Sequence, residues 1–158
     1  MDEVHTRTDA DLYDRDFGAW IDEQAGHLRN GRYTSLDTAH LIEEVEALGK
    51  SQLFALRSSY SLIAMHLLKQ MKQPEKATAS RENTINRERG NVVDLLEDNP
   101  GLKPKREGAF AKAYGKARSD AAFETKLDLR HFPVEPPFTL EQLESRDWWS
   151  EGFPRTGE

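Results

Sequence analysis

The sequence predicts an all-α protein: a single-domain bundle of about five helices, with an extended, proline-rich C-terminal segment packed on it. Three observations lead to this prediction. Apolar residues recur at intervals of three and four along most of the chain, and no stretch alternates as a strand does. Glycines, prolines and capping residues separate these stretches. The 37% hydrophobic and 32% charged residues suit slim helices with a small core.

The first expected helix spans residues 10–29. Asp9 or Asp11 can cap its start, and Gly31 offers the left-handed residue that ends a helix. Its inward face consists of residues at helical spacing, namely Tyr13, Phe17, Trp20, Gln24 and Leu28.

Two further helices are expected on either side of Gly49. The first starts at Asp37, an N-cap residue, and faces inward with Leu41, Val45 and Leu48. The second opens at Ser51, ends before Pro74 and carries the longest apolar stripe, formed by Leu53, Leu56, Tyr60, Ile63, Leu67 and Met71. A hairpin at Gly49 would bring these two helices face to face.

The remaining elements complete the bundle over residues 10–130. Ser80 can cap a fourth helix that ends before the sequence DNPG, and a fifth helix ends near Thr125. Prolines stiffen the connector HFPVEPPF, and TLEQLES can add one capped turn. Residues 131–153 form the C-terminal segment. We expect its aromatic side chains, Trp148, Trp149 and Phe153, to pack on the bundle, the alternative being a contact with another chain.

Composition excludes several classes of protein. The chain has no cysteine, which rules out disulfides, thiolate zinc sites and cysteine nucleophiles. Its N-terminus does not resemble a signal peptide, and no run approaches the roughly 18 apolar residues of a membrane span. Motifs for a nucleophilic serine or a nucleotide phosphate loop are also missing. We therefore expect a cytoplasmic, non-enzymatic protein over residues 1–158, without membrane contact.

Charge is unevenly distributed. Residues 1–48 hold 4 basic and 12 acidic side chains, whereas residues 69–118 hold 12 basic and 7 acidic ones. The basic segment could bind nucleic acid, but no helix-turn-helix or aromatic stacking pattern accompanies it. We favour packing of the basic half against the acidic half, within the chain or across a dimer. Arg81, Arg87 and Arg89 are candidates to bind an anion or partner, the alternative being a solvated basic loop.

His66 lies in the most apolar stretch of the chain. It shares a polar stripe with Ser59 and Gln70, so we expect a hydrogen-bonded seam between helices. Two alternatives would use Glu44 across the expected hairpin. Glu44, His66 and His40 could bind a metal ion, or Glu44 could orient His66 for proton transfer. Because H-E-x-x-H and paired E-x-x-H motifs are missing, we favour the structural role and expect no cofactor, a metal ion being the alternative.

Several stretches together resemble a known family. YDRDFGAWI, LDTAHLIEEVEALGKS, ALRSSYSLIAMHLLKQ, LLEDNPGL and FPVEPPFTLEQL resemble, in this order and spacing, the bacterial domain-of-unknown-function family 29. The resemblance covers roughly residues 12 to 149. It implies an all-helical, cytoplasmic bacterial protein and brings no catalytic residues. We therefore expect a helical interaction module with a protein partner or with a second copy of itself.

Overall fold

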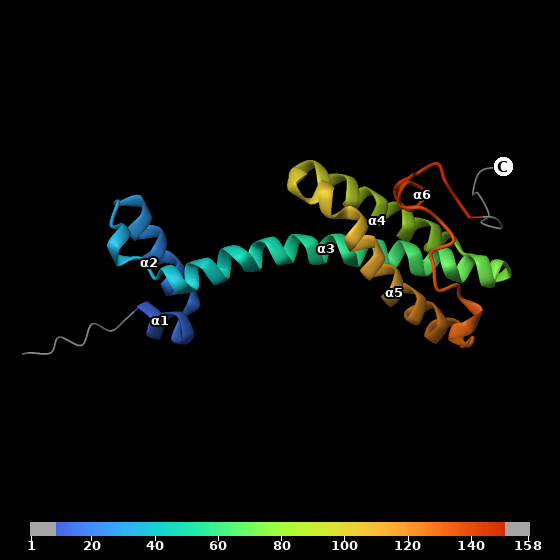
Figure 1. The fold of residues 1–158 in the computed structure, drawn as a ribbon, viewed down its shortest axis with the longest axis horizontal. Coiled ribbons are helices and arrows are strands. Elements are labelled where there is room, and N and C mark those ends of the chain that lie inside the picture. The colour runs from blue at the N-terminus through green and yellow to red at the C-terminus, as the bar shows by residue number, and fades with distance from the viewer. Residues whose placement is uncertain (1–8, 151–158) are drawn as a thin grey trace, which may run out of the picture. The chain divides into compact units, whose positions relative to one another are not determined.

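The structure, a computed structural model, describes residues 9–150 of the chain. It confirms the all-α prediction, because the elements in this range are helices and no strand occurs among them. Short 3₁₀ turns connect the α-helices (Figure 1), which are α1 Asp9–Arg15, α2 Phe17–Arg29, α3 Thr38–Lys72, α4 Ala79–Asp98, α5 Arg106–Thr125 and α6 Leu140–Glu144.

Contacts between residues divide the chain into two compact units. Unit 1 is Met1–Lys50 and unit 2 is Ser51–Glu158, so the boundary falls inside α3. The assignment of residues 1–158 to a single domain stays a prediction, because a division by contacts does not measure whether each unit folds independently.

Unit 1 contains α1, α2 and the start of α3. The predicted helix over residues 10–29 is wrong in one respect, since it is interrupted at Asp16. Asp16 leaves the helical conformation and its side chain accepts a hydrogen bond from the Ala19 amide at 3.0 Å, so it caps α2. Gly31, with φ of 67°, confirms the predicted stop after α2.

The prediction of two helices joined at Gly49 is wrong. Helix α3 runs for 35 residues through this position, and Gly49 does not adopt a positive φ. A glycine inside a helix costs only about 1 kcal/mol relative to alanine. The good helix formers Ala47, Leu48 and Lys50 surround it, and the helix continues.

Unit 2 is built around the second half of α3. Figure 1 shows α4 beside this half and α5 crossing it, with α6 next to α4. Their buried apolar side chains form one core. Leu56, Tyr60, Ile63 and Leu67 of the predicted stripe are fully buried in it, whereas Met71 is exposed. Ala64 and Leu68 are also fully buried, so this part of α3 is covered on more than one face.

The ends of the unit 2 helices follow local capping chemistry. Thr78, not Ser80, caps α4, because its side chain accepts a hydrogen bond from the Arg81 amide at 3.3 Å. Helix α5 ends at Thr125 as predicted, with Lys126 in the left-handed conformation at φ of 59°.

The C-terminal segment packs on unit 2. Thr139 and Gln142 form a capping box at the start of α6, which confirms the predicted capped turn. Trp148 and Trp149 are half-buried against the core, as expected. Phe153 lies outside the described residues.

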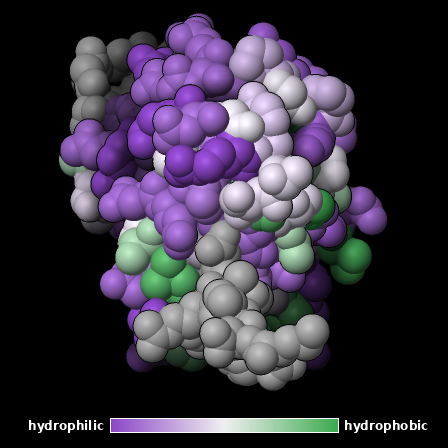
Figure 2. All heavy atoms as spheres, turned by 90° about the vertical axis from the view of Figure 1, so that its left-hand side faces the viewer, coloured by the Kyte–Doolittle hydropathy of each residue, from purple (hydrophilic) through white to green (hydrophobic). Residues whose placement is uncertain are grey.

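The surface is mostly polar, in keeping with a mean hydropathy of −0.78. Figure 2 shows largely hydrophilic side chains on the face that it draws, with hydrophobic ones in small groups. Within residues 9–150, none of the helices has the length and apolar character needed to cross a bilayer.

Candidate functional site

His66 lies in unit 2 and is half-buried. Burial lowers its pKa to about 4, and the neighbouring Lys69 ammonium adds to this effect. Its Nδ1 atom has no hydrogen-bond partner within residues 9–150. The expected bond from His66 to Glu44 or to a serine is therefore not observed for this nitrogen, and the ring lies in the unit 2 interior as a neutral group.

The other two members of the predicted seam are buried beside different partners. Ser59 donates a hydrogen bond to Glu88 Oε2 at 2.9 Å, and Gln70 Nε2 donates to the Pro74 carbonyl at 3.4 Å. Glu88 is itself buried and also accepts from Asn91 at 3.2 Å. The polar interior of unit 2 thus joins α3 to α4 through Ser59, not through His66.

The proposed metal ligands Glu44 and His40 belong to unit 1, whereas His66 belongs to unit 2. The hairpin that was to bring Glu44 toward His66 does not form, because α3 is continuous. In the part of the chain that the structure describes, no three His, Asp or Glu side chains are placed to bind a metal ion together. The metal site stays a prediction, but without the geometry that suggested it.

The three candidate anion-binding arginines differ in their surroundings. Arg87 is largely exposed and pairs with Glu88 at 3.0 Å. Arg81 is half-buried, and its Nη1 has no partner within residues 9–150. Arg89 is fully buried, with its Nε donating to the Leu143 carbonyl at 2.8 Å. Arg89 therefore holds the C-terminal segment and does not present a guanidinium to solvent.

A second buried cluster fixes α6 to α3 and α5. Tyr60 donates a hydrogen bond to Glu144, and Arg106 binds the same carboxylate through two nitrogens, one of them Nε at 3.0 Å from Oε1. The bond to Glu144 raises the pKa of Arg106, so the guanidinium stays charged. Burial and the same carboxylate raise the pKa of Tyr60. These hydrogen bonds join members of the cluster to one another and hold α6 against α3 and α5.

Unit 1 contains a compact cluster of aromatic and acidic side chains where α1, α2 and α3 meet. Trp20 Nε1 donates to Asp37 Oδ2 at 3.1 Å, and His40 Nδ1 lies 2.7 Å from the same oxygen. The ring of Tyr13 stacks on His40, with centroids 3.9 Å apart, and its hydroxyl donates to Glu44 Oε1 at 2.5 Å. The cluster fixes the crossing of the three helices at one end of unit 1.

The charges in this cluster are coupled. The hydrogen bond that His40 donates to the Asp37 carboxylate raises the pKa of His40, and the bond to Glu44 raises the pKa of Tyr13 to about 12. Burial alone would raise the pKa of Asp37, but its hydrogen bonds with His40 and Trp20 outweigh burial and lower it. The ion pair Asp37–His40⁺ is the favoured state in mildly acidic solution.

We expect the pKa of His40 to lie above the ordinary 6.5 and to fall back toward it in Asp37→Asn. Because the folded pKa is raised, the stabilisation by this pair is complete below pH 6.5 and is lost as the pH rises through the folded pKa. A histidine-detected NMR titration measures the shift. The matched change Asp22→Asn, at an exposed position of α2, should leave the pKa of His40 unchanged.

An apolar groove runs between α2 and α3 in unit 1, beside this cluster. Its volume is about 410 Å³, and Trp20, Gln24 and Glu44 contribute to its lining. The apolar side chains along it are 45–66% exposed, namely Phe17, Ile21 and Leu28 of α2 with Val45 and Leu48 of α3. The expectation that Val45 and Leu48 face a core is therefore wrong for this structure. We call this surface the unit 1 groove.

A comparison with models of known protein families identifies the family of this chain. The sequence model of the family described as Domain of unknown function DUF29 matches residues 12–149. The chain belongs to the DUF29 family. No curated protein and no solved structure matches it. The DUF29 match covers both the unit 1 groove and the whole described part of unit 2 except Ser150.

The sequence did not reveal the open groove of this DUF29 protein. The stripe formed by Tyr13, Phe17 and Trp20 predicts a buried helix face, but only Trp20 of the three is fully buried. Helical spacing shows which residues share a face and does not show what covers that face. The sequence feature that sets this region apart is its charge, with 12 acidic and 4 basic side chains over residues 1–48.

His66 gives this DUF29 protein a measurable acid sensitivity. In the unfolded chain the His66 ring takes up a proton near pH 6.5, whereas in the folded protein the same ring does so only near pH 4. Stability is therefore complete above pH 6.5 and falls as the pH drops toward 4. Between about pH 7 and about pH 5, we expect the free energy of unfolding to fall by about 1 kcal/mol more than in His66→Gln, after allowing for solvent screening. Urea unfolding at both pH values measures this difference, and equal losses in the two proteins would contradict it.

Proposed function

We propose that this protein is a non-enzymatic helical interaction module of the bacterial cytoplasm, and that its unit 1 groove binds an amphipathic helix of a partner protein. The observation that carries the proposal is the row of exposed apolar side chains along the groove. An apolar groove between two helices is a recurrent receptor for the apolar face of a third. The absence of cysteine suits a reducing cytoplasm.

The small core of unit 1 supports a bound helix. Between residues 12 and 50, only Trp20 and Gln24 are fully buried. Helices gain most of their stability by burying an apolar face against a neighbour. A third helix in the groove would cover Val45 and Leu48, each 66% exposed, and would enlarge this core.

Charge favours a basic partner over a second copy. Residues 1–48 hold 4 basic and 12 acidic side chains, a net charge of −8. Pairing two such units through their grooves would bring like charges together, which opposes association. A helix with lysine or arginine flanking its apolar face would instead be attracted, and its encounter rate would fall as salt rises.

A labelled model peptide tests this proposal with the full chain. The peptide is an amphipathic helix with leucines on one face and lysines on the other, and fluorescence anisotropy measures its binding. We expect saturable binding of this peptide and much weaker binding of a peptide with glutamates in place of the lysines. Val45→Lys and Leu48→Lys together should abolish binding, because they remove apolar surface and repel the peptide.

Ile42→Lys is the matched control. Ile42 is 55% exposed on α3 but does not line the groove, so this variant changes charge and hydropathy without altering the groove. Equal loss of binding in Ile42→Lys and in the groove variant would overturn the proposal. A stable dimer in sedimentation velocity, dispersed by the groove variant and not by Ile42→Lys, would overturn it in favour of self-association.

A further inference from the structure

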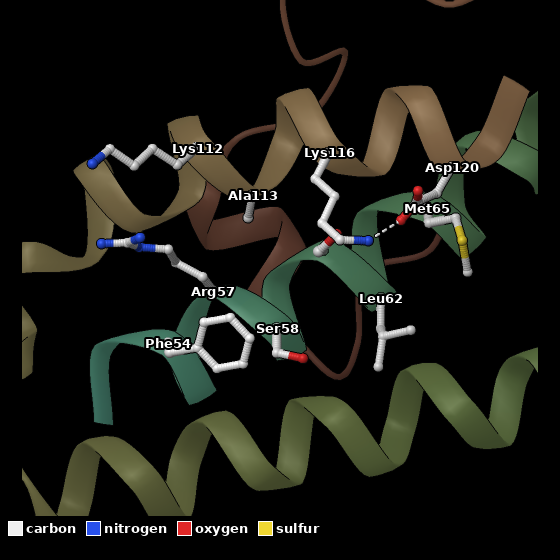
Figure 3. A pocket seen from close by; sticks show the side chains of 10 residues that line it. Phe54, Arg57, Ser58, Leu62, Met65, Lys112, Ala113, Lys116 and Asp120 are labelled. Atoms are coloured by element: carbon white, nitrogen blue, oxygen red, sulfur yellow. Dashed lines mark hydrogen bonds and ion pairs between the residues drawn. The ribbon is translucent and has the colours of Figure 1, made fainter. Parts of the chain in front are cut away.

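Unit 2 has a pocket of its own between α3 and α5, distinct from the unit 1 groove. Its volume is about 330 Å³, at the lower end of the range for small-molecule sites. Apolar side chains such as Phe54 and Leu62 form part of its lining, and the small side chain of Ala113 contributes from α5. We call it the α3–α5 pocket (Figure 3).

Positive charge gathers in the α3–α5 pocket. Arg57 of α3 lines it together with Lys112 and Lys116 of α5, and Asp120 is its one acidic residue. Lys116 is paired with Asp120. Figure 3 shows the side chains of Arg57 and Lys112 extending in the same direction at one end of the pocket, while Lys116 reaches toward Asp120. The end with Arg57 and Lys112 therefore carries the uncompensated charge.

Two observations indicate that this end is built for an anion. Within residues 9–150, neither Arg57 nor Lys112 forms an ion pair. Both residues also line an adjoining depression together with Lys105, which adds a third positive charge nearby. Like charges in one pocket repel unless an anion lies between them. In addition, Nε of Arg57 is buried and has no acceptor in the same range of residues. Buried donors are nearly always bonded, so the protein's own acceptors do not fully satisfy the guanidinium of Arg57.

We propose that the α3–α5 pocket binds a small organic phosphate, with its phosphate held by Arg57 and Lys112 and its apolar part lying along Phe54. A phosphate monoester carries about −1.5 to −2 charges near neutral pH, which matches two free cations. Arginine binds phosphate through paired N–H donors. Phe54 is 70% exposed, so an aromatic ligand can stack on it without displacing core residues.

The hydroxyl groups of the α3 wall suit the same ligand. Ser58 and Ser61 lie one helical turn apart and both line the pocket. Serine hydroxyls donate and accept, so they can bind phosphate oxygens or the ribose of a nucleoside phosphate. The apolar lining explains why an organic phosphate fits better than inorganic phosphate alone.

Adenosine monophosphate is the probe for the first experiment, and isothermal titration calorimetry with the full chain is the measurement. We expect saturable binding with a Kd of about 1 mM or tighter, and no detectable binding of adenosine. Arg57→Gln and Lys112→Gln should each weaken binding at least about tenfold, as loss of a charge-assisted contact predicts. Phe54→Ala should weaken the binding of adenosine monophosphate more than that of inorganic phosphate.

Matched variants make the result specific to the pocket. Lys76→Gln removes the same charge at an exposed position outside the pocket, and it should bind as the wild type does. Arg57→Lys keeps the charge and should restore part of the affinity lost in Arg57→Gln. Because Arg57 is half-buried, thermal unfolding of each variant shows whether it is folded before its affinity is compared.

Three outcomes would overturn the proposal. One is the absence of saturable binding of adenosine monophosphate by the wild type. Another is an equal loss of affinity in Lys76→Gln and Lys112→Gln, which would indicate nonspecific attraction. The third is binding of adenosine as tight as the binding of adenosine monophosphate. None of these depends on the unit 1 groove, so this test and the peptide experiment can fail separately.

Discussion

Replacing Arg89 with alanine should lower the free energy of unfolding of unit 2 by about 3–5 kcal/mol. Arg89 is fully buried, and its guanidinium donates to the carbonyls of Leu143 at 2.8 Å and Gln142 at 3.2 Å. Its charge also lies 5.0 Å from the centre of the Trp149 ring. The variant leaves two carbonyls without this donor and opens a cavity where the side chain lay. Urea unfolding, monitored by tryptophan fluorescence, measures the loss of stability.

Two further variants separate the causes. Arg89→Met fills most of the volume but makes no hydrogen bond, so we expect it to recover part of the loss. Arg130→Ala removes an exposed arginine that pairs with Asp128 at 3.6 Å, and it should change stability by less than about 0.5 kcal/mol. Equal stability of Arg89→Ala and Arg130→Ala would show that Arg89 does not hold the C-terminal segment.

Glu144→Gln should destabilise unit 2 by about 2–4 kcal/mol. The substitution keeps the size of the side chain but removes the charge that binds Arg106 and accepts from Tyr60. The side chains of Arg106 and Glu144 are 30% and 18% exposed, so solvent compensates only partly for the lost pair. Urea unfolding at neutral pH measures the change.

A double-mutant cycle that combines Tyr60→Phe with Glu144→Gln measures how strongly Tyr60 depends on the charge of Glu144. Because both side chains share one carboxylate, we expect a coupling energy of about 0.5–3 kcal/mol between the two changes. Glu141→Gln, at an exposed position of the same short helix, is the matched control and should cost less than about 1 kcal/mol. Additive effects of Tyr60→Phe and Glu144→Gln would mean that the hydrogen bond of Tyr60 gains nothing from the charge of the carboxylate.

The helix positions were largely predictable because they depend on local chemistry. Gly31 shows how this works, since its left-handed conformation ends α2 as the sequence indicates. Gly49 shows the limit, because the same residue type lies inside α3 with helical neighbours on both sides. A glycine permits a stop without requiring one. Asp16 shows the opposite case, in which a helix ends where the sequence predicts that it continues. Its capping side chain divides one predicted helix into two.

The long-range contacts could not be predicted from spacing. Arg89 and Leu143 are 54 positions apart, and Tyr60 and Glu144 are 84 apart. Nothing in helical periodicity indicates such partners, so the sequence predicts that Arg89 binds an anion or a partner, and the structure instead buries it against Leu143. The α3–α5 pocket could not be predicted for the same reason, because it combines Arg57 of α3 with Lys112 of another helix. His66, singled out by its apolar neighbours, is instead a neutral ring in the unit 2 interior.

The hydrogen bonds that Arg89 and Arg106 donate to residues 142–144 also bear on the order in which unit 2 can fold during synthesis. Helices α3, α4 and α5 leave the ribosome first, yet two of their arginines have their acceptors on residues 142–144. Until those residues emerge, Arg89 and Arg106 remain charged groups without these partners, and burying them is unfavourable. We therefore expect unit 2 of the nascent chain to stay open to chaperones and proteases until α6 has emerged.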